Sequence, residues 1–176
     1  MCALVDACVK SRVFNSKDAE HPKFETISKW IVEGSGNVVY GGKTYMEQLG
    51  SRYRDLFLEL KTAGRAHRIP SDKVDQLEEL LKKKVNNKKF DDAHLIALIR
   101  LSKCCIICTS DDRFLPFFRR KDLYPRGAKQ PKIHSLNQGS KHCSNSEVVG
   151  ECPRRISADA SGRRPKARPK VPLLSR

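Results

Sequence analysis

Residues 104–114 read CCIICTSDDRF, and this stretch decides the fold because an apolar run ends abruptly in polar residues. Residues 104–108 have the composition of a β-strand that is buried on both faces, as in a parallel sheet. Asp111 and Asp112 follow almost at once. The sequence therefore predicts a central strand that carries acidic side chains at its carboxyl end.

Two further apolar segments adjoin acidic residues. Near the N-terminus, CALVDACV (2–9) places Asp6 directly after a short strand-like run. In FDDAHLIALIRL (90–101), Asp91 and Asp92 open an apolar helical segment. Either acid is also a common helix-capping residue, and Asp91 in particular could cap the helix that Asp92 begins. Sequence spacing alone does not place this helix start beside the two strand ends.

Strand-like and helical segments alternate along residues 1–140, which predicts an α/β domain. We expect a three-layer α/β/α sandwich with a mainly parallel central sheet. Ser71 is the expected N-cap of the helix that follows Pro70. The predicted strands are the run before Asp6, 37–40, 104–108 and 131–134, and the predicted helices are 24–34, 45–60, 72–85, 90–101 and 113–123.

The composition changes in the last part of the chain. Residues 144–176 hold eight Lys or Arg against three acids, with frequent Pro, Gly and Ser and no helical or strand period. Segments of this kind do not bury enough apolar surface to fold on their own. We therefore divide the chain into a domain at 1–140 and a basic, disordered tail at 141–176.

The whole chain is strongly basic, with 35 Lys and Arg against 20 Asp and Glu and a formal charge of +15. Such a charge favours binding to a polyanion, and nucleic acid is the usual one. Two clusters are the candidate contacts for backbone phosphates: Lys82, Lys83, Lys84, Lys88 and Lys89 in the first, and Arg119, Arg120 and Lys121 in the second.

The sequence also indicates a compartment. No early segment resembles a signal peptide, and no apolar run approaches the ~20 residues that span a bilayer. Seven cysteines, an odd number at irregular spacing, favour a reduced protein over a disulfide framework. We therefore expect a cytoplasmic protein that does not associate with membranes.

The strand-end acids suggest a metal site. Ligands of an open parallel sheet bind outside the carboxyl ends of the strands, where Asp6 and Asp111 are expected. Carboxylates that are brought together repel one another unless a cation holds them. An oxygen-only ligand set without a Cys–His site is typical of Mg²⁺ or Mn²⁺.

Three motifs resemble those of the PIN-domain ribonucleases. VDACV (5–9) follows the opening pattern of that family, in which an apolar strand leads to an Asp and a small residue. DAHLIA (92–97) is similar to the helix headed by the third acid of the family, and TSDDRF (109–114) matches the pattern Thr-x-Asp-x-x-Phe around the fourth acid. The resemblance covers roughly residues 1–140.

The resemblance implies a catalytic and metal-binding set of Asp6, Glu47, Asp92 and Asp111. Glu47 lies one place earlier than the second acid of the family, where this chain has Gln48. Supporting roles fall to Thr109, Asp112 and Asp91, with Thr109 expected to hydrogen-bond a metal ligand or a water molecule.

This resemblance predicts hydrolysis of RNA phosphodiester bonds with Mg²⁺ or Mn²⁺, by an endoribonuclease whose nucleophile is water. Single-stranded DNA is a second candidate substrate. Many bacterial members of the family are toxins, so an antitoxin or another protein partner and a homo-oligomer are further expectations. The alternative reading is an RNA- or partner-binding module in which the imperfect second acid has abolished catalysis.

Overall fold

A five-stranded parallel sheet lies at the centre of the computed structural model, which describes residues 2–135 and 171–174. The strand order is β3-β2-β1-β4-β5, and every neighbouring pair is parallel. The strands are β1 (Cys2–Val5), β2 (Asn37–Gly41), β3 (Ala66–Ile69), β4 (Ile106–Cys108) and β5 (Lys132–His134). The central strand is therefore β1, which precedes Asp6, and its neighbour β4 precedes Asp111.

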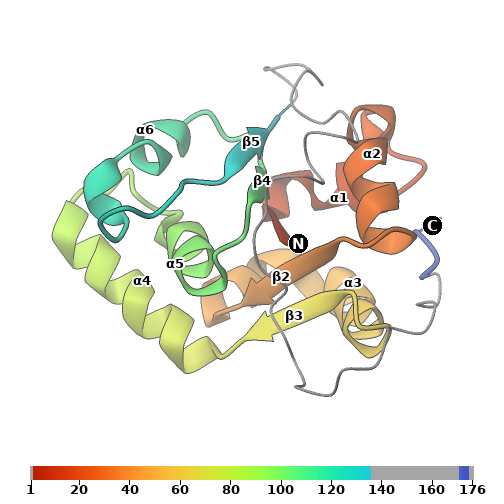
Figure 1. Ribbon diagram of the computed structural model, residues 1–176, viewed down its shortest axis with the longest axis horizontal. Coiled ribbons are helices and arrows are strands. Elements are labelled where there is room, and N and C mark those ends of the chain that lie inside the picture. The colour runs from red at the N-terminus through yellow and green to blue at the C-terminus, as the bar shows by residue number, and fades with distance from the viewer. Residues whose placement is uncertain (1, 136–170, 175–176) are drawn as a thin grey trace.

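Helices cover both faces of the sheet, as Figure 1 shows. On one side lie α1 (Lys10–Phe14), α2 (His21–Val32) and α3 (Lys43–Thr62), and on the other α4 (Ser71–Val85), α5 (Ala93–Ser102) and α6 (Leu115–Phe118). This arrangement confirms the predicted three-layer α/β/α architecture. None of the helices in the described residues has the length and apolar character needed to span a bilayer.

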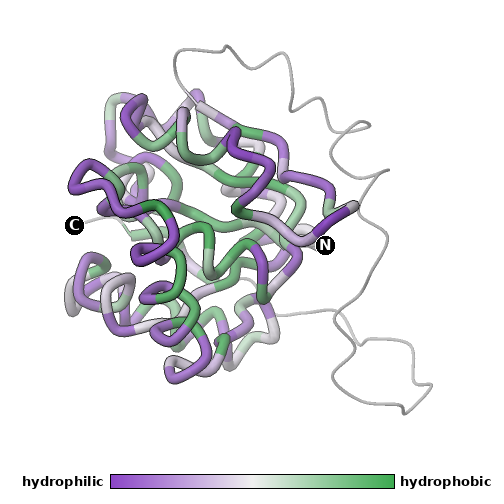
Figure 2. Tube along the Cα trace, turned by 90° about the vertical axis from the view of Figure 1, so that its left-hand side faces the viewer, coloured by the Kyte–Doolittle hydropathy of each residue, from purple (hydrophilic) through white to green (hydrophobic). Residues whose placement is uncertain are grey.

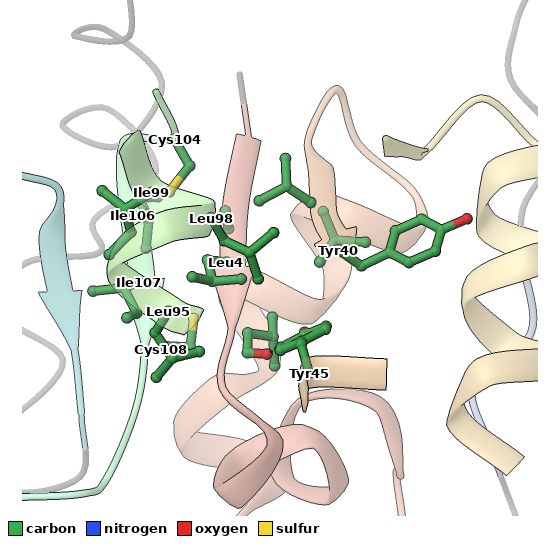
Figure 3. Packing of buried hydrophobic residues seen from close by; sticks show 14 of the residues in the cluster. Leu4, Tyr40, Tyr45, Leu95, Leu98, Ile99, Cys104, Ile106, Ile107 and Cys108 are labelled. Carbon is green, nitrogen blue, oxygen red and sulfur yellow. Dashed lines mark hydrogen bonds between the residues drawn. The ribbon is translucent and has the colours of Figure 1, made fainter. Parts of the chain in front are cut away.

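The core forms where α5 packs against the central strands. Figure 3 shows Leu95 and Leu98 of α5 beside Leu4 of β1, and all three side chains are fully buried. Burying a side chain of this size contributes about 2 kcal/mol. In Figure 2, hydrophobic segments run through the middle of the domain and hydrophilic ones lie around it. The unbroken apolar runs of β1 and β4 follow from this burial on both faces.

The turn after β2 requires glycine. Gly41 and Gly42 have φ values of 148° and 78°, which L side chains rarely adopt. A Cβ atom on Gly42 would lie 2.5 Å from Cγ1 of Val74, and one on Gly41 would lie 2.3 Å from the carbonyl oxygen of Ile69. The predicted Gly-Gly turn is confirmed, and it directs the chain into α3.

Several elements differ from the prediction. Strand β3 and the short helices η1 (Ala7–Val9) and α1 were not predicted, and the expected helix over 113–123 consists only of α6 and η2 (Lys121–Leu123). Pro116 at the second position of α6 allows a helix to start there but not to extend back toward Arg113. Pro70, rather than Ser71, occupies the N-cap position of α4, without a side-chain capping bond.

The end of the predicted tail is ordered. Leu174 pairs with Asn15 in a parallel β-bridge. Its N–H donates to the carbonyl of Phe14 at 2.9 Å, and the N–H of Ser16 donates to its carbonyl at 3.3 Å. Val171 is buried in the core. Residues 171–174, which the sequence analysis assigned to the tail, thus pack against the domain, and the rest of that tail lies outside the described residues.

Candidate functional site

Asp6 and Asp111 reach the same edge of the sheet because their strands are neighbours. Val5 of β1 is in register with Cys108 of β4, and the N–H of Asp6 donates to the carbonyl of Cys108 at 2.9 Å. The chain thus leaves both strands at the same level, next to each other. Asp6 is buried, whereas Asp111 is partly exposed. The adjacency expected from two strand-end acids is present.

Thr109 links the two aspartates. Its hydroxyl donates to Oδ2 of Asp6 at 2.6 Å and accepts the N–H of Asp111 at 3.1 Å. Cys8 adds a thiol hydrogen bond to Oδ2 of Asp6 at 3.1 Å and an N–H bond to Oδ1 at 3.2 Å. Burial, with the charge of Asp6, raises the pKa of the Cys8 thiol to about 11, so it remains a neutral donor. These bonds fix the Asp6 carboxylate in one orientation.

Asp92 stands at the N-cap position of α5 but its side chain makes no capping hydrogen bond. Burial, together with the charges of Asp6, Asp91 and Asp111, raises the pKa of this carboxyl to about 7, and the charge of Arg113 acts in the opposite direction. Repulsion of this kind requires that the carboxylates lie near one another. We call Asp6, Asp92 and Asp111 the aspartate cluster, because the charges of Asp6 and Asp111 act on Asp92; Asp91, whose charge also acts on Asp92, is exposed.

The raised pKa of Asp92 predicts how stability depends on pH. The folded protein holds this proton more tightly than the unfolded chain, whose carboxyl has its ordinary pKa of 3.8. Its contribution to stability is full below pH 4 and is lost as pH rises through 7. We expect Asp92→Asn to match the wild type at pH 4 and to exceed its free energy of unfolding by about 1 kcal/mol at pH 8, after allowance for solvent screening.

Denaturant titrations at both pH values measure this difference, with Asp55→Asn, an exposed aspartate on α3, as the matched control. The control should leave the difference between the two pH values unchanged. A wild-type excess of stability over Asp92→Asn at pH 8 would contradict a costly ionised carboxyl at this position.

Asp111 is held by an arginine two residues further along the chain. The N–H and Nε of Arg113 donate to Oδ1 at 2.9 and 3.1 Å, and its Nη2 donates to Oδ2 at 2.7 Å. Hydrogen bonding to Arg113 lowers the pKa of the Asp111 carboxyl. Asp91 and Asp112, the predicted supporting acids, are both exposed. Arg113 was not predicted as a site residue.

Glu47 is exposed on α3 and is not among the charges that shift the pKa of Asp92. Its neighbour Gln48 presents its backbone carbonyl to the ammonium of Lys10. Lys10 is therefore a basic group near Asp6. Burial lowers the pKa of Lys10, whereas the negative charge of Asp6 raises it.

A second buried polar group was missed by sequence reasoning. Glu78 of α4 is only 4 % exposed and accepts hydrogen bonds from the hydroxyl of Thr44 at 3.1 Å and from Lys82 at 2.5 Å. His94 of α5 is fully buried, and neither ring nitrogen makes a hydrogen bond of normal geometry within the described residues. Burial lowers the pKa of His94, against the charges of Glu78 and Asp6.

A signal for Glu78 was present in the sequence. Val74, Glu78 and Leu81 recur at helical spacing, so this glutamate lies on the buried face of α4. An acid on an apolar helical face is more informative than one at a solvated position, because burial of a charge is costly unless it is paired. The pairing with Lys82 and Thr44 satisfies that requirement.

The two predicted basic clusters come together at the end of α4. Lys84 pairs with Asp122 at 3.6 Å, and Arg120 forms two hydrogen bonds with the same carboxylate at 2.9 and 3.1 Å. Lys82 already forms a salt bridge with Glu78 of the same helix. The remaining residues of these clusters are exposed: Lys83, Lys88, Lys89, Arg119 and Lys121.

The arrangement of the acids has clear limits. Within residues 2–135 and 171–174, no three side chains of His, Cys, Asp or Glu lie close enough to hold a metal ion. Two surface hollows, one beside β3 and one in the loop after η2, include none of the three aspartates. None of the five cysteines in the same residues forms a disulfide.

No protein-family model matches the chain, and neither a curated protein nor a solved structure matches it.

Proposed function

We propose that this protein is a divalent-metal-dependent ribonuclease that hydrolyses RNA phosphodiester bonds at the aspartate cluster. The observation that carries the proposal is that two neighbouring strands bring Asp6 and Asp111 to the same edge of the sheet, where the Thr109 hydroxyl bonds to both residues. The net charge of +15 attracts RNA to the protein. The aspartates repel the RNA phosphates unless a bound cation neutralises their charge. The family resemblance of the motifs at 5–9, 92–97 and 109–114 supports the same activity.

The donor set suits Mg²⁺ or Mn²⁺, because it consists of carboxylate oxygens. The capping bond that would occupy the Asp92 side chain is missing, so its oxygens are available to a ligand. Asp6, Asp92 and Asp111 would hold the ion, which, when bound, supplies positive charge against the scissile phosphate.

The protein's own residues have distinct roles in this proposal. Thr109 and Cys8 orient the Asp6 carboxylate. The exposed Lys83, Lys88 and Lys89 contact backbone phosphates, which attracts RNA without reading its sequence. Free cysteines are typical of a reducing compartment, and we propose that the protein acts in the cytoplasm.

The proposal is tested by incubating end-labelled RNA and single-stranded DNA with the purified protein and Mg²⁺, Mn²⁺ or EDTA. We expect RNA cleavage with either ion and none with EDTA, since three repelling carboxylates need the ion to accept a phosphate. Restoring excess Mn²⁺ to the EDTA sample should restore cleavage, which excludes irreversible damage by the chelator. Cleavage that persists in EDTA, or no cleavage under any condition, would overturn the proposal.

A second candidate function is an RNA- or partner-binding module without catalysis. The second acid favours it, because Glu47 lies one place earlier than in the resembled family and Gln48 stands in the expected place. In that case the wild type binds RNA but leaves it intact with both ions. The same assay, read beside a binding titration, separates the two candidates.

A further inference from the structure

The end of helix α1 leaves backbone groups that another strand can pair with. The last carbonyls of a helix have no partner within the helix. After Phe14 the backbone becomes extended, because Asn15 has φ −116° and ψ 108°. The N–H of Asp18, four residues after Phe14, donates to the carbonyl of Asn15 at 3.0 Å. The carbonyl of Phe14 and the N–H of Ser16 are therefore accessible to a strand that lies alongside.

Leu174 supplies the partner for both groups. Its N–H donates to the carbonyl of Phe14 at 2.9 Å, and its carbonyl accepts the N–H of Ser16 at 3.3 Å. This is the pattern of a parallel β-bridge centred on Asn15. Pro172 has no N–H, and in an extended chain that group would face the same side as the N–H of Leu174. The pairing therefore cannot continue in this direction, and the bridge stays isolated.

Apolar side chains complete the docking of residues 171–174. Val171 is 6 % exposed and belongs to the core of the domain, and Leu173 and Leu174 pack against that core. Figure 1 shows the segment in blue at the edge of the domain. In the chain, residues 136–170 separate it from Ser135, so no short turn fixes its position. The contacts of the segment itself must hold it there.

We propose that the surface beside α1 is a binding site for an extended apolar peptide, and that residues 171–174 occupy it as an intramolecular ligand. The backbone of residues 14–16 provides a donor and an acceptor, and the adjoining core provides apolar contacts. Main-chain hydrogen bonds with side-chain contacts beside them are a recurrent mode of peptide recognition. A protein partner with a segment of the same kind would have to displace residues 171–174. This inference does not depend on the proposed nuclease activity.

A free peptide of residues 170–176, KVPLLSR, should bind to a variant whose own segment is undocked. Val171→Asp places a charge where the wild-type side chain is buried, so the segment should leave the surface. A tethered ligand acts at an effective concentration on the order of 1 mM. The wild type should therefore bind the free peptide about tenfold more weakly than Val171→Asp does.

Fluorescence anisotropy of the labelled peptide, titrated with each full-length protein, measures these affinities. Leu174→Asp is a second undocked variant, since Leu174 packs against the core, and it should also bind more tightly than the wild type. Leu80→Asp is the matched control, because Leu80 is 63 % exposed on α4, and it should keep the wild-type affinity. A peptide that carries Val171→Asp should bind to none of these proteins. Thermal unfolding verifies that each variant is folded.

Each other outcome would overturn the proposal. Equal affinities of the wild type and the two undocked variants would exclude an intramolecular ligand, and no binding to either variant would exclude a peptide site. Loss of folding in both variants would make residues 171–174 part of the core. By light scattering, Val171→Asp should have the mass of the wild type, and a wild-type dimer that this variant dissociates would place the segment on a second copy. None of these results bears on RNA cleavage, which has its own assay.

Discussion

Replacement of Asp6 by Asn is expected to lower the rate of RNA cleavage by about a thousandfold or more, while RNA binding persists or improves. Asp6 is the most buried acid of the cluster, and its carboxylate is oriented by Thr109 and Cys8. Asn has the same shape and still accepts the Thr109 hydroxyl, but it has no charge to hold a divalent ion. The variant should therefore fold normally but carry out the chemical step of cleavage much more slowly.

The measurement is single-turnover cleavage of labelled RNA with saturating Mn²⁺, beside a filter-binding titration of the same RNA. Asp55→Asn removes an exposed carboxylate from α3 and should cleave at the wild-type rate. If Asp6→Asn cleaves as fast as this control, the aspartate cluster does not carry the reaction. Comparable melting temperatures for the two variants would verify that the loss is not due to unfolding.

Replacement of Thr109 by Val should lower cleavage by about 10- to 100-fold, the usual effect of removing a residue that orients a metal ligand. Valine matches threonine in shape but neither donates to Asp6 nor accepts from the N–H of Asp111. Because Thr109 is 1 % exposed, water cannot easily take the place of its hydroxyl beside the buried Asp6. The free energy of unfolding should fall by about 1–3 kcal/mol.

Thr109→Ser keeps the hydroxyl and should recover most of the cleavage, so it separates the hydrogen bonds from the loss of a methyl group. Rates come from the same single-turnover assay and stabilities from urea titration. Equal rates for Thr109→Val and the wild type would show that the orientation of Asp6 does not depend on this hydroxyl.

The central elements of the fold were predictable because burial leaves a clear pattern. Strands β1 and β4 are apolar on both faces, and α5 is apolar over most of its surface, so their sequences differ from those of exposed segments. Strand β3 lies at the edge of the sheet and contains His67 and Arg68, which break any apolar run. Helix α1 is five residues long and depends on its packing against α2 rather than on a local pattern.

The candidate site was predictable where an acid follows a strand. Asp6 and Asp111 could be placed at one edge because parallel strands share their carboxyl end, while the position of Asp92 depends on how α5 packs back on the sheet. The exposure of Glu47 follows from the orientation of α3, which spacing does not determine. The bond between Arg113 and Asp111 depends on a side-chain rotamer, for which the sequence holds no periodic signal.

The bridge between Leu174 and Asn15 has a practical consequence for handling the protein. An affinity tag or fusion partner joined close to this bridge would lie beside α1, whose Arg12 contacts Ser110 next to Asp111. A bulky addition there would press on the short helix that borders the aspartates. Cleavable tags, removed before any assay, would avoid mistaking a disturbed helix for an inactive enzyme.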